Sequence, residues 1–222
     1  MYKYLILLML LFGSINLKAQ TKPDSTLKGT DYSIGTEFLF AFNNCFKTWI
    51  EVKPLQKSFG IELTPEVYLS DYYSLGFNRD KITGVGLGLY GKKYFGKLIN
   101  SPLMFNAGAT LRSINVGYSD KGFIPFQEDG QRYYRYASFN DVLKIHSMLV
   151  NCTIQGRLTN SPIFFLDVYA GVGYKFSTSS STYPGYRSYN SHTTDYAYRG
   201  ALFLAGIKTT FNSRQLSRTG KK

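Results

Sequence analysis

The stretch Thr83-Gly84-Val85-Gly86-Leu87-Gly88-Leu89-Tyr90 alternates small or polar residues with branched apolar ones, and Lys92 continues its glycine face. Successive side chains of a β-strand point to opposite faces, so one face of this stretch is apolar and the other small or polar. Three glycines would be costly inside a helix, whereas in a barrel they leave room for large inward side chains from neighbouring strands. The stretch therefore predicts one wall strand of a β-barrel.

The same period of two recurs along the chain. We predict strands at Tyr32 to Phe42, Phe59 to Leu69, Tyr72 to Asn78, Thr83 to Phe95, Leu103 to Tyr118, Val142 to Leu158, Ile163 to Phe176 and Tyr198 to Phe211. The fifth loses its phase near Ser113, where we expect a β-bulge. These segments are about as long as a tilted strand that crosses a bilayer, and an even number can close. The fold class predicted is all-β: an eight-stranded antiparallel up-and-down transmembrane barrel.

The predicted connections alternate in length. The longer or more polar ones are Asn43 to Ser58, Arg79 to Ile82, Ser119 to Asp141 and Ser177 to Ala197. The tight ones centre on Ser70-Asp71, Gly96 to Pro102 and Thr159 to Pro162, with the Pro, Asn and Ser residues that suit turns. Long outer loops, short inner turns and two periplasmic termini are typical of outer-membrane barrels.

The N-terminus has the features of a secretory leader. Residues 1–3 supply a basic start, Leu5 to Phe12 an apolar run too short to span a membrane, and Leu17-Lys18-Ala19 a small-residue cleavage site. We predict a signal peptide over 1–19, a periplasmic segment over 20–30, a barrel over 31–211 and a basic tail over 212–222. The alternative for the leader is a retained anchor; the tail is either a disordered end or docks to an acidic partner or peptidoglycan.

Charge and cysteine content narrow the function classes. The formal charge is +12, and removal of Lys3 and Lys18 with the leader leaves +10. Because the basic residues are scattered, we expect anionic lipid headgroups and surface polysaccharide as partners, and no nucleic acid. Cys45 and Cys152 are too few for a disulfide framework and lack metal-ligand spacing, so we expect no metal and no cofactor.

The chain also resembles a known family. The leader, the stretch Pro65-Glu66-Val67-Tyr68-Leu69-Ser70-Asp71-Tyr72, the glycine-alternating strands and the terminal Gly206 to Phe211 strand are similar to the outer-membrane β-barrel family labelled "porin family" or "outer membrane protein beta-barrel domain". The resemblance implies an OmpA-like, monomeric barrel in the Gram-negative outer membrane, inserted by the barrel-assembly machinery. It transfers no catalytic residue. The family's barrel-assembly signal usually ends the chain on an aromatic residue, whereas here Asn212 to Lys222 follow Phe211.

The competing fold is a soluble barrel such as a lipocalin, whose apolar residues point inward around a ligand cavity. The aromatic apolar faces would then have to crowd one small interior, so the sequence favours the transmembrane barrel.

Nine ionisable residues fall on the inward faces of the predicted strands. They form a predicted lumen polar network: Glu37, Glu62, Glu66, Lys92, Arg112, Arg157, Asp167, Lys175 and Lys208. Buried charges persist when they are paired, and we hypothesise that Glu62 and Glu66 pair with Arg112 or Arg157. A lumen of eight strands is just wide enough to be filled by side chains, so we expect a packed plug, with a narrow porin for small solutes as the alternative.

An enzyme that modifies lipid A is the remaining alternative, and we expect that the protein is not an enzyme. His146 and Ser147 are strand neighbours that point to opposite faces, so they do not form a catalytic dyad. His192 lies in a polar loop beside Thr193 and Asp195.

Two of the long connections combine tyrosine with arginine, as recognition surfaces do. The candidate recognition residues are Tyr133, Tyr134, Arg135, Tyr183, Tyr186, Arg187 and Tyr189. The alternative for these residues is an aromatic girdle whose basic side chains grip lipopolysaccharide. The sequence thus predicts a non-enzymatic outer-membrane barrel with a structural or surface-interaction role.

Overall fold

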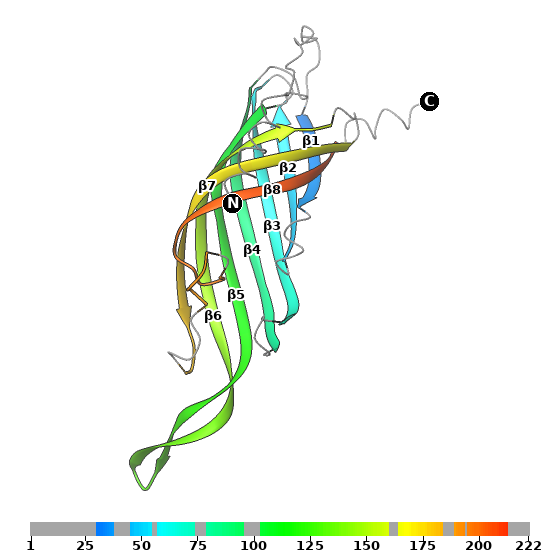
Figure 1. Ribbon diagram of the computed structural model, residues 1–222. Helices are drawn as coiled ribbons and strands as arrows, with labels where there is room; N and C mark the ends of the chain where they lie inside the picture. Colours follow the sequence, from blue (N-terminus) through cyan, green and yellow to red (C-terminus); the bar gives the residue numbers. More distant parts are fainter. Residues whose placement is uncertain are drawn as a thin grey trace, which may run out of the picture.

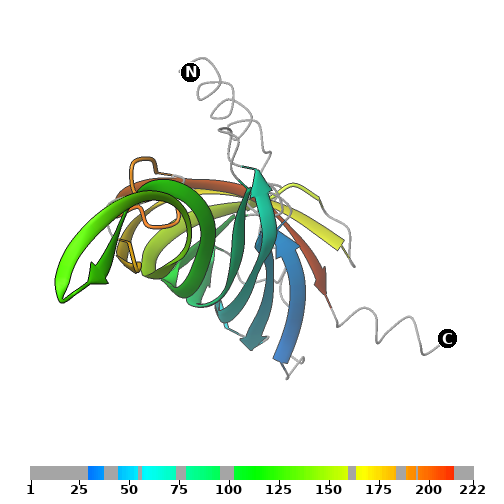
Figure 2. The ribbon, with the colours of Figure 1, turned by 90° about the horizontal axis from the view of Figure 1, so that it is seen from below.

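The computed structural model describes residues 30–37, 45–54, 57–73, 79–95, 103–159, 164–183, 189–193 and 195–212. The predicted leader, nearly all of the periplasmic segment and the tail beyond residue 212 lie outside these residues. The strands are β1 (Thr30–Glu37), β2 (Cys45–Pro54), β3 (Phe59–Tyr73), β4 (Arg79–Tyr94), β5 (Leu103–Glu128), β6 (Gln131–Arg157), β7 (Phe164–Ser180) and β8 (Gly200–Asn212). Each pairs antiparallel with the next, and β1 pairs with β8, from Ser33 opposite Asn212 to Glu37 opposite Lys208. The predicted eight-stranded, up-and-down barrel is confirmed (Figures 1 and 2).

Two strand assignments from the sequence are wrong. The total of eight strands is nevertheless correct, because one strand was missed and one predicted strand is not a separate strand. The predicted first loop, 43–58, contains β2, in which Phe46, Ile50 and Val52 alternate with inward Lys47, Trp49 and Glu51. The predicted third strand, 72–78, is not separate in its described part, because Tyr72 and Tyr73 end β3 and residues 74–78 lie outside the described residues.

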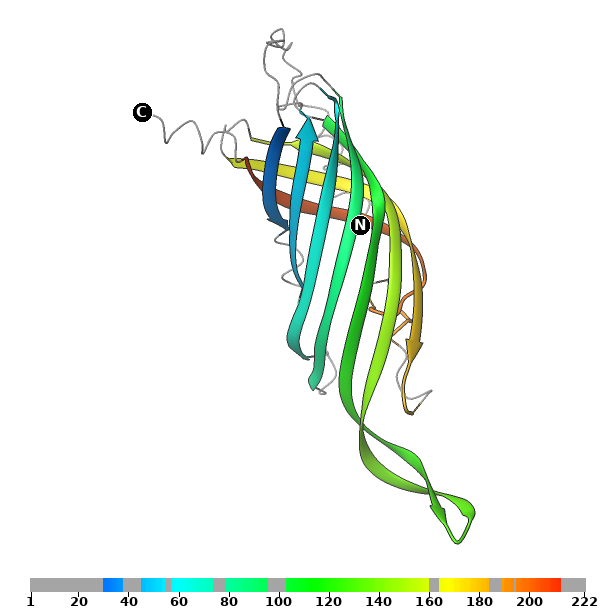
Figure 3. The same ribbon diagram turned by 180° about the vertical axis from the view of Figure 1, so that it is seen from behind.

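Three predicted connections are strand instead. Ser70-Asp71 lies inside β3, and residues 79–82 begin β4. The predicted loop 119–141 is a two-stranded ribbon formed by the far ends of β5 and β6, which turn at Asp129 and Gly130 (Figure 3). We call the end of the barrel that carries this ribbon the hairpin end, and the opposite end, where β1 begins and β8 finishes, the turn end.

A belt of apolar side chains surrounds the barrel on its outer face, at the turn-end side. Every strand contributes to it, for example through Ile34, Ile50, Leu63, Leu87, Leu111, Val150, Val172 and Phe203. Burial alternates at every residue of β6 from 138 to 150, and farther along the strand outward Ile154 still lies between buried Thr153 and Gln155. The inward-apolar alternative is therefore wrong for this part of the barrel.

Both faces of the wall change character at one level. On β5, outward Leu111 gives way to outward Ser113, while inward Arg112 gives way to inward Ile114. Residue-by-residue pairing runs unbroken through Ser113 to both neighbouring strands, so the expected bulge is absent there. The alternation loses its phase in the sequence because the apolar residues change from the outer face to the inner face, while the strand itself remains regular.

Two further observations complete the fold. Cys45 is inward and buried at the start of β2, and Cys152 lies within β6; both are free thiols. No helix that is long and apolar enough to cross a membrane occurs among the described residues.

Candidate functional site

The first ionic cluster of the lumen is built around Lys92 on β4. Its ammonium lies 2.9 Å from Glu51 on β2 and 3.5 Å from Glu62 on β3, and Lys208 on β8 approaches Glu62 at 2.7 Å. Both ammonium groups also face the ring of Trp49, at 5.3 and 5.6 Å from its centroid. Two cations and two carboxylates thus neutralise each other across four strands, as buried charges must.

The second ionic cluster lies on the hairpin-end side of the first. Arg112 holds Glu66 through Nε at 2.6 Å and Nη2 at 3.0 Å, a bidentate geometry. Lys47 bridges from Glu37, at 3.0 Å, to Glu66, at 3.9 Å. Tyr169 donates a hydrogen bond to Glu37 and Tyr68 donates one to Glu66, so the carboxylates have further donors.

The third cluster is at the turn end. The Arg157 guanidinium lies 3.0 Å from Asp167 and 3.8 Å from the ring centroid of Phe165. Gln155 donates to the same carboxylate at 2.9 Å. The strands place these groups together because Arg157 and Asp167 are directly opposite in the β6–β7 register.

The hypothesised pairing holds in part. Glu66 pairs with Arg112, but Glu62 pairs with the lysines of the first cluster and Arg157 with Asp167. Lys175 lies nearer the hairpin end and donates to the backbone oxygen of Asp195. The sequence reasoning missed Lys47 and Glu51, although the alternation of Phe46, Thr48, Ile50 and Val52 against them is visible in the chain.

Glycines make room for these groups, as expected. A Cβ on Gly86 would meet both Glu66 and Arg112, and one on Gly206 would meet the ring of Tyr169. The void that remains among Lys47, Glu62, Arg112 and Lys208 has a volume of about 40 Å³, little more than the space of one water molecule. This arrangement favours a packed plug over an aqueous passage.

At the hairpin end the lumen is apolar and is covered by the segment between β7 and β8. The buried cluster comprises Cys45, Tyr68, Ile82, Ile114, Val116, Tyr118, Phe139, Leu143, Ile145 and Ala197, with Tyr183, Tyr189 and Tyr196 packed on it. Tyr183 lies 4.7 Å from Phe139 between ring centroids, and Tyr189 donates to Asp80 at 2.5 Å. We call this covering segment, described over 181–183, 189–193 and 195–199, the cap.

Asp141 ties the cap to β6. Its carboxylate accepts hydrogen bonds from the backbone N–H groups of Thr182 and Tyr183, both at 3.2 Å, and from the Tyr118 hydroxyl at 3.0 Å. Burial of this carboxyl opposes its ionisation, but the hydrogen bonds to the charged form outweigh burial and hold the pKa of Asp141 below its usual range. Asp141 lies beyond the apolar belt, so the cap is held by an ionised group on the hairpin-end side.

The candidate recognition residues separate into two groups. Tyr183 and Tyr189 are half-buried against the apolar cluster at the mouth, so only part of each ring is available to a partner; Tyr186 and Arg187 lie outside the described residues. Tyr133, Tyr134 and Arg135 lie on the exposed ribbon.

The ribbon carries aromatic rings on both faces. Phe123 packs on Tyr136 with centroids 5.4 Å apart, and Phe126 packs on Tyr133 at 5.7 Å. Arg135 stacks over Phe126, and Tyr136 remains 65% exposed. A two-stranded ribbon of this length projects the rings well beyond the barrel wall (Figure 1).

The histidines do not join a catalytic group among the described residues. His146 faces outward with Ser113 directly opposite on β5, yet no hydrogen bond joins the two side chains and no described acidic side chain pairs with His146. His192 is exposed, and its backbone N–H donates to Asp195 at 2.8 Å. No group of three His, Cys, Asp or Glu residues that could hold a metal occurs in the described part of the chain.

The chain matches no protein-family model and no curated protein. Solved structures that are similar to it include two outer membrane proteins. A major outer membrane protein from Thermus thermophilus has 14% identity and a TM-score of 0.44, over 83% of this chain and 98% of that one. Acinetobacter baumannii CarO has 13% identity and a TM-score of 0.38, over 86% of this chain and 99% of that one.

Proposed function

We propose that the chain is an outer-membrane barrel with a plugged lumen, which displays the β5–β6 ribbon on the cell surface for interaction. The observation that carries this proposal is the apolar belt, with its exposed side chains on all eight strands and paired charges inside. Along β6 and the residue that follows it, the belt runs from Met148 to Leu158, about the length of a tilted strand that crosses a bilayer. Monomeric proteins that are surrounded by water rarely expose so large a continuous apolar surface.

The orientation follows from the lengths of the ends. Strands β5 and β6 extend far beyond the belt at the hairpin end, which corresponds to the long extracellular side of outer-membrane barrels. The ribbon then lies outside the cell, and its rings and arginines are suited to a protein or glycan surface. Assembly as a monomer by the barrel-assembly machinery belongs to the same proposal.

Membrane insertion is tested by electrophoresis of the outer-membrane fraction with and without boiling. A heat-dependent shift in mobility is expected of a closed, detergent-resistant barrel. Recovery of the protein from the soluble periplasm, without a shift, would refute the proposal. Display is tested with trypsin added to intact cells, where cleavage after Arg132 or Arg135 is expected and complete resistance of the ribbon would contradict it.

The two other candidate functions have weaker support. A narrow porin requires a passage past the three ionic clusters, and conductance steps in planar bilayers would establish it. A lipid-modifying enzyme requires a base and a nucleophile in hydrogen-bond contact, which Ser113 and His146 do not make here. Binding assays with a ribbon shortened between residues 121 and 138, against host matrix, glycan and phage, test the surface role; binding equal to that of the unaltered protein would remove it.

A further inference from the structure

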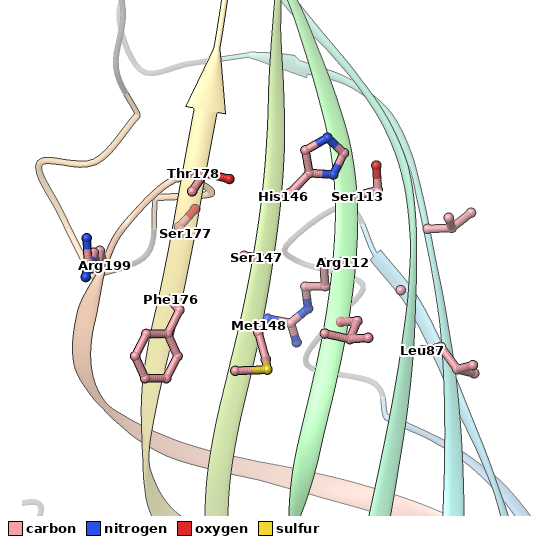
Figure 4. Close-up of a pocket in the computed structure, with 13 residues that line it drawn as sticks. Leu87, Arg112, Ser113, His146, Ser147, Met148, Phe176, Ser177, Thr178 and Arg199 are labelled. Atoms are coloured by element: carbon pink, nitrogen blue, oxygen red, sulfur yellow. The ribbon is translucent and has the colours of Figure 1, made fainter.

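A groove of about 700 Å³ lies on the outside of the barrel, across β4 to β7, at the level where inner and outer chemistry exchange (Figure 4). The groove is shallow and open to its surroundings along its length. The groove lies outside the lumen network and is separate from the ribbon.

One side of the groove is apolar. Leu87, Leu111, Met148 and Phe176 are successive cross-strand partners on four adjacent strands, so they form a continuous row. All four are exposed, from 38% at Met148 to 61% at Leu111. A row of this kind can cover the hydrocarbon of an acyl chain along its length.

The other side of the groove is polar on three of its four strands. The next outward row begins at apolar Val85 and continues through Ser113, His146 and Thr178, again as direct cross-strand partners. Arg199 reaches the groove from the segment before β8, on the far side of Ser177 and Thr178 (Figure 4). Lys144 is the next outward residue of β6 beyond His146 and is exposed.

The surface around the groove is electropositive. At the outward positions of β4 to β7 in the barrel wall there is no described Asp or Glu, whereas Lys81 and Lys144 point outward on the hairpin-end side of the groove. Neither Lys144 nor Arg199 forms an ion pair with a described carboxylate. Among the acidic side chains of these strands, Asp80, Asp141 and Asp167 are buried on the inner side of the wall, whereas Asp120 and Glu128 lie on the ribbon, away from the groove.

We infer that this groove seats a membrane lipid with a phosphate-bearing, anionic headgroup. The acyl chains lie against the row from Leu87 to Phe176, and the phosphate lies at the Arg199 side of the groove, where the Ser113 and Thr178 hydroxyls and the His146 ring supply hydrogen bonds. Lys144, one outward position beyond His146, adds positive charge next to the groove without lining it. Charge complementarity selects the anion, because this end of the groove offers cations and donors without a competing carboxylate. The inference rests on the proposed membrane insertion.

The test uses the full chain, folded in non-ionic detergent micelles and incubated with dioleoyl phosphatidylglycerol or dioleoyl phosphatidylcholine. Native mass spectrometry counts the lipid that remains on each barrel. We expect preferential retention of one phosphatidylglycerol, and about a fivefold loss of that preference for Arg199→Gln and for Lys144→Gln, the effect of removing one surface cation near a headgroup. Phe176→Ala should weaken retention of both lipids and preserve the preference for phosphatidylglycerol.

Lys121→Gln is the matched control, since it removes an outward lysine of β5 beyond the groove. Equal retention of the two lipids, or the same loss of preference in Lys121→Gln, would overturn the inference. Release of a lysolipid and a fatty acid would also overturn it, because the groove would then cleave its occupant rather than seat it. The mobility shift on boiling is measured on the same samples. If the protein forms a folded, heat-modifiable barrel that shows no lipid preference, only the inference of a lipid site is refuted. If no such barrel forms, the proposed function itself is refuted.

Discussion

The two halves of this barrel wall are made from the same strands, yet they are inverted with respect to each other. In the turn-end half, β5 and β6 direct Leu111 and Val150 outward and Arg112 and Thr153 inward. In the hairpin-end half the same strands direct Ile114 and Ile145 inward and Asn115 and Lys144 outward. The exchange occurs within two residues and without a change of register.

The comparison shows that the surroundings, and not the backbone, decide which face of a strand is apolar. A wall surrounded by lipid needs apolar side chains outside and satisfied polar groups within, whereas a wall surrounded by water needs the reverse. The hairpin-end half is locally the inward-apolar barrel that was considered as the competing fold. Under the proposed function, the level of Ser113 and His146 marks the outer boundary of the hydrocarbon.

The largest expected effect comes from breaking a charge cluster in the lipid-facing half. Lys92→Met would leave Glu51 and Glu62 buried with one cation fewer, which costs about 3–5 kcal/mol of unfolding free energy. Urea unfolding in lipid vesicles measures this loss. The control is Lys93→Met, because Lys93 is exposed and its ammonium donates a hydrogen bond to the Ser58 hydroxyl; a change within about 1 kcal/mol is expected. Equal losses in the two variants would show that the lumen charges are solvated.

The inversion itself is tested by the same substitution on either side of it. Val150→Lys places a charge in the outer belt, and we expect a cost of about 2–4 kcal/mol, whereas Val142→Lys on the same face of β6 lies beyond the boundary and should change stability by about 0.5 kcal/mol or less. Both are measured by unfolding in vesicles. Equal tolerance of the two lysines would place the belt in water and remove the membrane boundary.

The hairpin-end half is expected to respond to pH through Asp141. The pKa of Asp141 is lowered in the folded state. The stabilisation that its ionised carboxylate gives the folded protein is therefore complete above the pKa of the unfolded chain, about 3.9, and is lost as the pH falls below that value toward the folded-state pKa. Hydrogen exchange of the Thr182 and Tyr183 amides should accelerate about tenfold to a hundredfold in Asp141→Ala at neutral pH, because hydrogen bonds to a charged group are lost. In the unaltered protein the same acceleration should appear only below about pH 4. Protection that is independent of both changes would mean that aromatic packing alone holds the cap.

The sequence predicts the fold class because apolar and polar residues alternate in the part of every strand that carries the belt. It predicts the inward charges because the charged residues share a strand face with glycines and tyrosines. It failed at β2, where Lys47, Glu51 and Lys53 are polar enough to suggest a loop. Their partners come from β1, β3 and β4, so the pairing that makes these charges tolerable inside is long-range and cannot be read locally.

The same reason explains the misread connections. Where a strand leaves the lipid, its apolar residues move from the outer face to the inner face. Near Ser113 this change produces the same shift in the sequence pattern as a β-bulge would in a strand that had lipid around its whole length. The sequence predicts a loop at the ribbon because aromatic residues occupy both of its faces. It predicts recognition residues in the cap because tyrosine suits both a binding surface and an apolar mouth.

The smallest expected effect is at the tip of the ribbon, farthest from the boundary. Asp129 and Gly130 have φ values of 49° and 76°, the left-handed pair that two-residue hairpins require. Gly130→Ala meets no atom within 4 Å, so its cost is purely conformational, about 1 kcal/mol, whereas Asp129→Asn should be neutral because asparagine tolerates this region. Trypsin cleavage after Arg132 and Arg135 reports the ribbon, and urea unfolding reports the barrel. Faster cleavage with unchanged barrel stability is expected, since the ribbon edges beyond Gly117 and Lys144 pair with no described strand other than each other; a matching loss in the barrel would show that the two halves unfold as one unit.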